Sequence, residues 1–230
     1  MKESLLLKKD IKVKNYASFT DKFNIIMMGE KGVGKTDILK ELSKKKYDKF
    51  KKFYTENDNQ NNSNENINQD IVKKISLEYT SDDKNYLIKM WNYCYISDPQ
   101  LINDFMKKAD AFIIVYSVID KNSFNYLDRW ITEAKNKTTS KDIQFFIIGN
   151  NCDYINERQV GIDEIKQFVE KDNYKFFEIS LKKKKNFEQS FNEIFSDVIN
   201  MEYSDSDFSE MEVSKNKKCC SCCKKYCLIF

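Results

Sequence analysis

A glycine-rich octapeptide holds the residues of this sequence that are best suited to chemistry. It reads Gly-Glu-Lys-Gly-Val-Gly-Lys-Thr from Gly29 to Thr36 and meets the pattern G-x-x-x-x-G-K-[ST]. Glycines let consecutive backbone N–H groups surround phosphate oxygens, Lys35 brings positive charge to the outer phosphates, and Thr36 offers a hydroxyl to Mg²⁺. The sequence therefore predicts a phosphate-binding loop for a nucleotide, made by Gly29, Lys31, Gly32, Val33, Gly34, Lys35 and Thr36.

Such a loop needs a strand before it and a helix after it. The apolar run at residues 23–28 leads into the glycines, and residues 35–46 have a helical pattern. The N-terminus of that helix adds the positive end of its dipole to the phosphate site. This context disfavours a chance match in a lysine-rich chain.

The rest of the body alternates apolar runs with helical segments. Expected strands cover residues 23–28, 71–79, 86–91, 111–118, 143–149 and 174–180, and expected helices cover residues 35–46, 123–135, 162–171 and 187–201. Nearly continuous apolar strands separated by helices are typical of parallel sheets covered on both faces. We predict an α/β fold with a central, mostly parallel six-stranded sheet flanked by helices on both faces.

Composition excludes several classes of protein. The 230 residues contain no histidine, which removes His-based acid–base, metal-ligating and triad chemistry. Only Cys94 and Cys152 of the seven cysteines lie in the body, so a disulfide framework is not expected. No apolar run is long enough to span a bilayer, and the first residues do not form a signal peptide. We expect a cytoplasmic monomer that does not bind nucleic acid.

Domain boundaries follow from changes in composition. We expect an N-terminal extension at residues 1–20, one nucleotide-binding domain at residues 21–201, and a flexible tail at residues 202–230. Residues 57–68 contain seven asparagines and are too polar to form a core, so they are expected to be an inserted loop within the domain.

Beyond the phosphate loop, residues 147–153 and 178–182 carry motifs that resemble those of Rab-type small GTPases of the Ras superfamily. Residues 147–153 resemble the guanine-reading N-K-x-D motif, with Asn150 and Asp153 at its key positions. The Asp153 carboxylate can accept both N–H groups of a guanine edge, which adenine does not offer. Residues 178–182 resemble the E-T-S-A-K loop that also contacts the base, which implies that Ser180, Leu181 and Lys182 bind guanine.

The resemblance extends in order along residues 20–200. Residues 186–191 resemble N-V-E-Q-x-F, and Trp91 after the strand-like residues 87–90 resembles the start of I-W-D-T-A-G-Q-E. Residues 114–120 resemble I-V-Y-D-V-T-D, and residues 123–130 match S-F…W. It implies a Ras-like P-loop domain that binds GTP or GDP with Mg²⁺ and regulates vesicle-mediated protein transport. The partners it implies are effectors, exchange factors and prenyl-carrier proteins.

The sequence departs from the family where the γ-phosphate would be sensed and cut. Asn92 replaces the aspartate that helps to hold Mg²⁺, keeping its shape without its charge, so the Mg²⁺ site on Thr36 is expected to be weakened. Tyr95 replaces the switching glycine, and Ile96 replaces the glutamine that orients the attacking water. No catalytic residue is intact, so the GTP hydrolase activity that the resemblance implies is expected to be slow or impaired.

Other departures affect switching and base affinity. The switch I threonine has no counterpart near residues 68–69, and Thr55 is the nearest threonine. Asn151 replaces the lysine that packs along guanine, and Lys31 adds a charge that could obstruct a partner's catalytic arginine. Two alternatives stay open: hydrolysis rescued by a partner residue, or a non-hydrolysing membrane adaptor that recruits partners.

The last residues carry a lipidation pattern. Cys227-Leu228-Ile229-Phe230 meets C-a-a-X, and Phe at X favours geranylgeranyl. One lipid chain binds membranes marginally, so a second signal is needed. Palmitoylation of Cys219, Cys220, Cys222 and Cys223, together with five nearby lysines, would supply it. We therefore expect anchoring to the cytosolic face of a membrane through a prenylated, polybasic tail that contacts membrane lipids. A zinc site made by the same four thiols is the less favoured alternative, because they lie within five consecutive residues with no second knuckle and no histidine.

Overall fold

Runs of large apolar residues form the centre of the sheet. These are β1 (Lys22–Met28), β5 (Ala111–Ser117) and β6 (Gln144–Asn150), and every residue of β5 is buried. β1 pairs in parallel with β5, and β5 pairs in parallel with β6. Parallel strands of this kind are buried because helices cover both of their faces.

The computed structural model describes residues 19, 21–44, 50–55, 74–95, 99–140 and 143–213, without side-chain detail for residues 50–55, 95, 99, 101 and 202–213. Its sheet has the order β2-β3-β4-β1-β5-β6-β7. The remaining strands are β2 (Phe50–Thr55), β3 (Lys74–Ser81), β4 (Lys84–Asn92) and β7 (Lys175–Glu178). β2 and β3 are antiparallel to their neighbours, and the other pairings are parallel.

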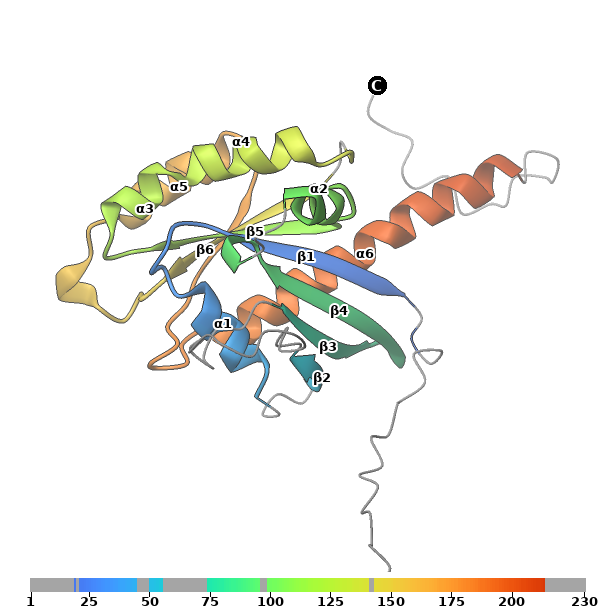
Figure 1. Ribbon diagram of the computed structural model, residues 1–230, viewed down its shortest axis with the longest axis horizontal. Helices are drawn as coiled ribbons and strands as arrows, with labels where there is room; N and C mark the ends of the chain where they lie inside the picture. Colours follow the sequence, from blue (N-terminus) through green and yellow to red (C-terminus); the bar gives the residue numbers. More distant parts are fainter. Residues whose placement is uncertain are drawn as a thin grey trace, which may run out of the picture.

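Helices form the two outer layers (Figure 1). They are α1 (Lys35–Leu42), α2 (Pro99–Lys107), α3 (Lys121–Asn125), α4 (Leu127–Lys137), α5 (Ile162–Glu170) and α6 (Phe187–Val213), with the 3₁₀ turns η2 (Tyr93–Tyr95) and η3 (Ile155–Glu157). Residues of α1 and α6 share one buried cluster with the odd-numbered residues of β1, from Phe23 to Met27. Residues of α2 to α5 share the other cluster with Ile26 and Met28. The alternation of side chains along each strand thus supplies two cores.

The fold class predicted from the sequence is confirmed. All six expected strands are present, and β2 is a seventh that lies at the edge of the sheet. This strand was not expected because residues 50–55 have two consecutive lysines and no apolar run. It is held by antiparallel pairing with β3 alone, a contact that no local pattern reveals.

Several boundaries differ from those expected. β3 extends to Ser81 and β4 starts at Lys84, beyond the expected ranges 71–79 and 86–91, so Asp82 and Asp83 alone make the turn. Both are in the left-handed region with φ of 48° and 60°, which suits a two-residue hairpin. The helix expected at residues 123–135 begins earlier because Asp120 caps it, accepting from the backbone N–H groups of Asn122 and Ser123. It divides at Tyr126 into α3 and α4.

The last helix is longer than expected. α6 continues to Val213, past the predicted end at Met201, since residues 202–213 contain neither glycine nor proline to stop a helix. The predicted tail therefore starts as helix. The Asn-rich insertion at residues 57–68 and the tail beyond residue 213 lie outside the described residues. Among the described helices, none has both the length and the apolar character that crossing a membrane requires.

Candidate functional site

The predicted phosphate loop connects the C-terminal end of β1 to the start of α1. Three of its glycines have positive φ: 137° at Gly29, 89° at Gly32 and 98° at Gly34. A Cβ at Gly29 would lie 2.2 Å from the carbonyl oxygen of Val115, and one at Gly34 would lie 2.3 Å from Asn150 Nδ2. Both the conformation and the crowding exclude side chains at these two positions. Glycine at these two positions therefore allows the loop to adopt the curved backbone that a phosphate site requires.

Lys35 is the first residue of α1 and is almost fully buried, with 5% of its surface exposed. Its Nζ donates to the carbonyl oxygens of Gly29 at 2.7 Å and Glu30 at 2.5 Å. Burial lowers the pKa of this ammonium group, and the nearby Cys94 and Glu30 oppose that shift. The positive charge of Lys35 is therefore held against the backbone of the phosphate loop. In contrast, the Lys31 side chain is exposed and Val33 is buried.

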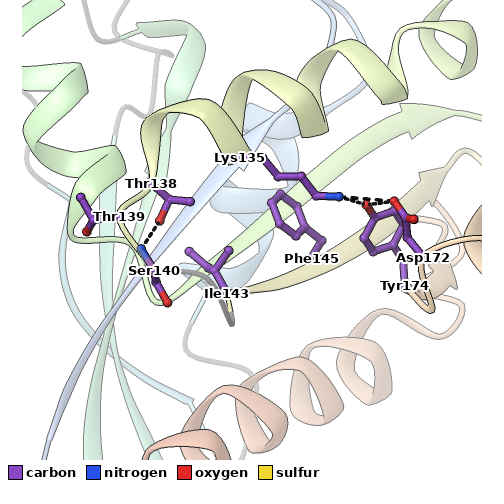
Figure 2. Close-up of a pocket in the computed structure, with 8 residues that line it drawn as sticks. All are labelled: Lys135, Thr138, Thr139, Ser140, Ile143, Phe145, Asp172 and Tyr174. Carbon is purple, nitrogen blue, oxygen red and sulfur yellow. Dashed lines mark hydrogen bonds and ion pairs between the residues drawn. The ribbon is translucent and has the colours of Figure 1, made fainter.

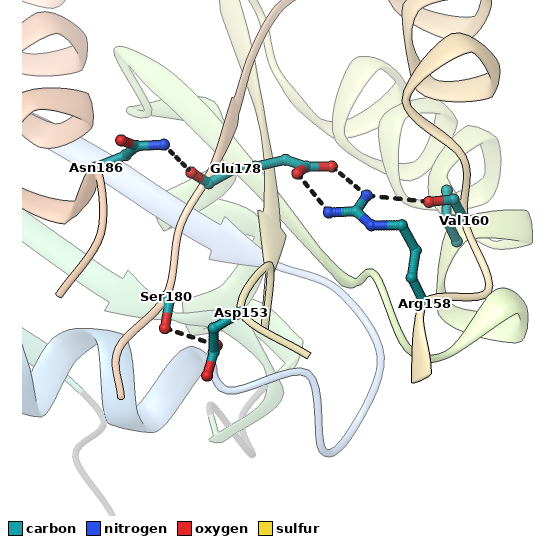
Figure 3. Close-up of polar contacts among 6 residues, drawn as sticks. All are labelled: Asp153, Arg158, Val160, Glu178, Ser180 and Asn186. Carbon is teal, nitrogen blue, oxygen red and sulfur yellow. Dashed lines mark hydrogen bonds and ion pairs between the residues drawn. The ribbon is translucent and has the colours of Figure 1, made fainter. Parts of the chain in front are cut away.

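The residues predicted to bind guanine meet the phosphate loop at the C-terminal ends of β6 and β7. Asn150, the last residue of β6, donates from Nδ2 to the carbonyl oxygen of Val33 at 3.0 Å. Its Oδ1 is buried and has no hydrogen-bond partner among the described residues. Ser180 Oγ donates to Asp153 Oδ1 at 2.6 Å, and this bond is the main cause that lowers the pKa of Asp153 (Figure 3). Segments far apart in the sequence are therefore joined at one edge of the sheet.

The loop at residues 181–185 completes this edge. The backbone of Ser180 donates to the carbonyl oxygen of Lys185 at 3.1 Å, and Lys183 donates its backbone N–H to Ser180 Oγ at 3.0 Å. Leu181 is half-buried against the core, whereas Lys182 is exposed with its Nζ 5.0 Å from the ring centroid of Tyr154. The contact between Lys182 and Tyr154 was not expected from the sequence.

An ion pair between Arg158 and Glu178, near the residues predicted to bind guanine, was also not expected from the sequence. Arg158 donates from Nη1 and Nη2 to the two carboxylate oxygens of Glu178, at 2.8 and 2.7 Å, and from Nη1 to the carbonyl oxygen of Val160 at 3.1 Å (Figure 3). Asn186 Nδ2 donates to the Glu178 carbonyl oxygen at 3.0 Å. Such a bidentate pair fixes geometry as well as charge. The pair ties the residue after η3 to the end of β7, and Asn186 ties the end of the 181–185 loop to the same strand.

Asn151 takes a different path from a lysine that covers a base. It has a positive φ of 66° and donates from Nδ2 to Ser117 Oγ at 2.9 Å. Its side chain is therefore bound to the end of β5. Asparagine tolerates this left-handed conformation better than most residues, which accounts for its presence here.

At the Mg²⁺ end, Asn92 lies beside Thr36. Asn92 is fully buried, and its Nδ2 donates to Thr36 Oγ1 at 3.3 Å. Its Oδ1 has no hydrogen-bond partner among the described residues. The hydroxyl and the free amide oxygen are oxygen donors of the kind that Mg²⁺ accepts, so the residues fit the ion. Neither brings the negative charge of a carboxylate, which limits how strongly the pair would hold it.

The parts predicted to sense the γ-phosphate are only partly described. Ile96 and residues 57–68 lie outside the described residues, and the side chains of Thr55 and Tyr95 are not described. The cysteines of the predicted tail, Cys219, Cys220, Cys222, Cys223 and Cys227, also lie outside them. Their predicted roles stay predictions.

A separate cavity of about 640 Å³ lies at the other end of the sheet, beside the starts of β6 and β7 (Figure 2). Lys135 crosses it, with its Nζ 2.7 Å from the Tyr174 hydroxyl and 3.3 Å from Asp172 Oδ2. The charges that line the cavity thus neutralise each other. It contains none of the residues predicted to bind the nucleotide.

The fold, and the loop between β1 and α1, define a P-loop α/β domain. The family described as Ras matches residues 24–200 of this chain. That match covers more than half of the sequence, so the chain belongs to the Ras family.

Curated relatives are Rab proteins at low identity. The Ras-related protein Rab11A of Lotus japonicus is 23% identical over 78% of this chain and 73% of its own. The Ras-related protein Rab-11B of Dictyostelium discoideum is 27% identical over 75% and 71% of the two chains. The Ras-related protein Rab-7a of Paramecium octaurelia is 27% identical over 85% and 90%. The resemblance to Rab-type small GTPases stated from the motifs is confirmed.

Proposed function

We propose that this chain is a Rab-like small GTPase that binds GTP and GDP and acts as a membrane-anchored regulator of vesicle-mediated transport, with slow or impaired hydrolysis. The observation that carries the proposal is the bond from Asn150 Nδ2 to the Val33 carbonyl oxygen, at 3.0 Å. It joins the strand end that would read the base to the loop that would hold the phosphates. A nucleotide would bind across both.

Base selectivity would come from Asp153. Ser180 Oγ donates to Oδ1 of this carboxylate, which holds the side chain in place and leaves other lone pairs open. Guanine presents two adjacent N–H donors that one carboxylate can accept together, whereas adenine presents a different pattern. The lowered pKa of Asp153 favours the charged acceptor form that this contact needs.

The phosphates would lie against the loop from Gly29 to Thr36. Its N–H groups and the N-terminus of α1 favour anions, and the buried Lys35 adds a full positive charge. Thr36 and Asn92 would hold Mg²⁺, which supplies neutralisation of the phosphate charge when bound. Because Asn92 is neutral, a higher Mg²⁺ concentration should be needed than with an aspartate at this position.

Hydrolysis is proposed to be slow because the position that orients the attacking water is Ile96, a hydrocarbon. Intrinsic rates in this class are low even with glutamine there, and arginines supplied by partners add about 10³–10⁵ in rate. A partner that brings its own polar residue would restore turnover.

A non-hydrolysing adaptor is the second candidate function. Two residues favour this candidate. Asn92 weakens the predicted Mg²⁺ site because it is neutral, and Ile96 cannot orient the attacking water. In that case, bound nucleotide would stabilise the fold while the surface recruits partners. Membrane attachment through Cys227 and the lysines of the tail, on the cytosolic face, serves both candidates, as do effector, exchange-factor and prenyl-carrier partners.

Two measurements on the purified chain separate the candidates. Nucleotide extracted from it should be guanine nucleotide, and Lys35→Ala should carry none. Phosphate release from preloaded GTP should be slower than about 10⁻⁴ s⁻¹ under single-turnover conditions. Release at or above that rate would contradict impaired hydrolysis. A rate indistinguishable from that of GTP in the same buffer without protein would favour the adaptor.

A further inference from the structure

The turn η2 places a thiol at the phosphate end of the candidate site. Cys94 Sγ lies 3.4 Å from the carbonyl oxygen of Gly29. Lys35 Nζ donates to that same oxygen at 2.7 Å. In a P-loop this lysine reaches the β- and γ-phosphates. Cys94 therefore stands beside the group that would meet the outermost phosphate.

Tyr93 holds η2 in this position by binding α4. Its hydroxyl donates to the Glu133 carboxylate, and Lys137 Nζ donates to the Tyr93 hydroxyl at 2.8 Å and to Glu133 Oε1 at 2.9 Å. The Tyr93 ring also packs edge-on against Trp130, with centroids 6.0 Å apart. Burial, followed by the hydrogen bond to Glu133, raises the pKa of Tyr93, which further favours the protonated hydroxyl that donates to Glu133. These contacts join η2 to α4, so moving η2 away from the phosphate loop would have to loosen them.

The predicted Mg²⁺ site, made by Thr36 and Asn92, is poorly suited to stabilise a triphosphate. Mg²⁺ held by Thr36 and Asn92 would neutralise phosphate charge, and a triphosphate carries more of that charge than a diphosphate, so it would depend more on the ion. Here the neighbour of Thr36 is the neutral Asn92, whose Nδ2 donates to the same hydroxyl that the ion would use, at 3.3 Å.

We propose that the site selects guanosine diphosphate over guanosine triphosphate, because η2, held by Tyr93, places Cys94 where the third phosphate would lie. The inference rests on the proposed guanine-nucleotide function and names the form of nucleotide that the site prefers. A triphosphate must displace η2 and lose contacts of Tyr93 with α4. Losing one or two net hydrogen bonds corresponds to about tenfold or more in affinity.

Competition against a fluorescent GDP derivative tests this preference on the full chain. GDP, GTPγS and ADP are titrated at the same Mg²⁺ concentration, and GDP should bind about tenfold or more tightly than GTPγS. Cys94→Ala removes the sulfur, and Tyr93→Phe removes the hydroxyl alone. Each should tighten GTPγS severalfold while changing GDP little. Tyr126→Phe is the matched control, because Tyr126 is 43% exposed at the junction of α3 and α4.

The outcomes separate this inference from the proposed function. Equal affinity for GDP and GTPγS overturns the preference, even when both bind more tightly than ADP. A preference that is unchanged in both Cys94→Ala and Tyr93→Phe overturns the role of η2. If GDP binds no more tightly than ADP, the guanine assignment itself fails. Repeating the titration at a saturating Mg²⁺ concentration isolates the metal: a preference that vanishes there belongs to the weak Mg²⁺ site and overturns the role of Cys94, whereas one that persists supports it.

Discussion

Asn150 binds the carbonyl oxygen of Val33 across the candidate site, with its Nδ2 at 3.0 Å from that oxygen. The amide comes from the end of β6 and the carbonyl from the loop that follows β1. Only 2% of the Asn150 surface is exposed, so the bond is protected from water. This bond joins the base-binding end of the site to the phosphate loop, so a substitution at either end should also weaken the other.

Asn150→Ala should therefore weaken both nucleotide binding and the fold. It leaves the Val33 carbonyl oxygen without this partner, which costs about 1–3 kcal/mol in the free energy of unfolding. Affinity for GDP should fall at least tenfold. Urea unfolding and GDP titration measure the two effects. Asn200→Ala, at an exposed position on α6, is the control. Equal behaviour of the two variants would refute the bridging role.

Gly34→Ala should damage the same junction from the side of the loop. Gly34 has a φ of 98°, and a Cβ there would lie 2.3 Å from Asn150 Nδ2. The backbone strain alone is worth about 1–3 kcal/mol, and GDP binding should be lost. Gly161→Ala is matched to it, since a Cβ at Gly161 meets nothing within 4 Å. That control should keep its GDP affinity, and a Gly34→Ala protein that also keeps it would contradict the crowding argument.

Arg158→Lys tests the support beneath the base loop. Lysine cannot reproduce the two parallel bonds to Glu178, which lie at 2.8 and 2.7 Å. Because the pair is partly exposed, the loss should be about 1–2 kcal/mol in unfolding free energy, with a severalfold loss of GDP affinity. Arg129→Lys changes the chain's other arginine, which is exposed on α4, and should have little effect. Similar unfolding midpoints for both variants would show that the pair does not support the loop.

Cys227→Ser tests membrane anchoring. Without the thiol, no prenyl group can be attached at the predicted C-a-a-X position. The second predicted signal, the other cysteines with the lysines of the tail, then binds membranes only weakly by itself. The variant expressed in eukaryotic cells should move from the membrane pellet to the supernatant. Arg129→Lys, at an exposed position on α4 that leaves the tail and the nucleotide site unchanged, should stay in the pellet. Pelleting of both variants to the same extent would rule out prenylation as the anchor.

The sequence predicted the elements whose own residues show that they are buried. β5 is buried along its whole length, so its apolar run alone indicates a central strand. β2 is different, because its sequence has adjacent lysines and its pairing depends on β3, which follows it only after residue 73. The end of α6 was missed for a related reason, since a polar segment without glycine or proline predicts neither continuation nor a stop.

The candidate site divides in the same way. The glycines and Lys35 follow a spacing that reflects the shape of a phosphate, so the sequence identifies them. The pair of Arg158 and Glu178 and the contact of Tyr93 with Glu133 have no such spacing, because they join residues 20 and 40 positions apart. Only the assembled sheet brings these side chains together.

The central claim, guanine recognition, is tested most directly by affinities for paired nucleotides. The wild-type chain should bind GDP at least a hundredfold more tightly than ADP, because a carboxylate at Asp153 rewards the two N–H donors of guanine. Asp153→Asn replaces one acceptor oxygen with a donor, so it should weaken GDP and favour xanthosine diphosphate, whose base has an oxygen in place of the exocyclic amine. Equal wild-type affinities for GDP and ADP would contradict the account.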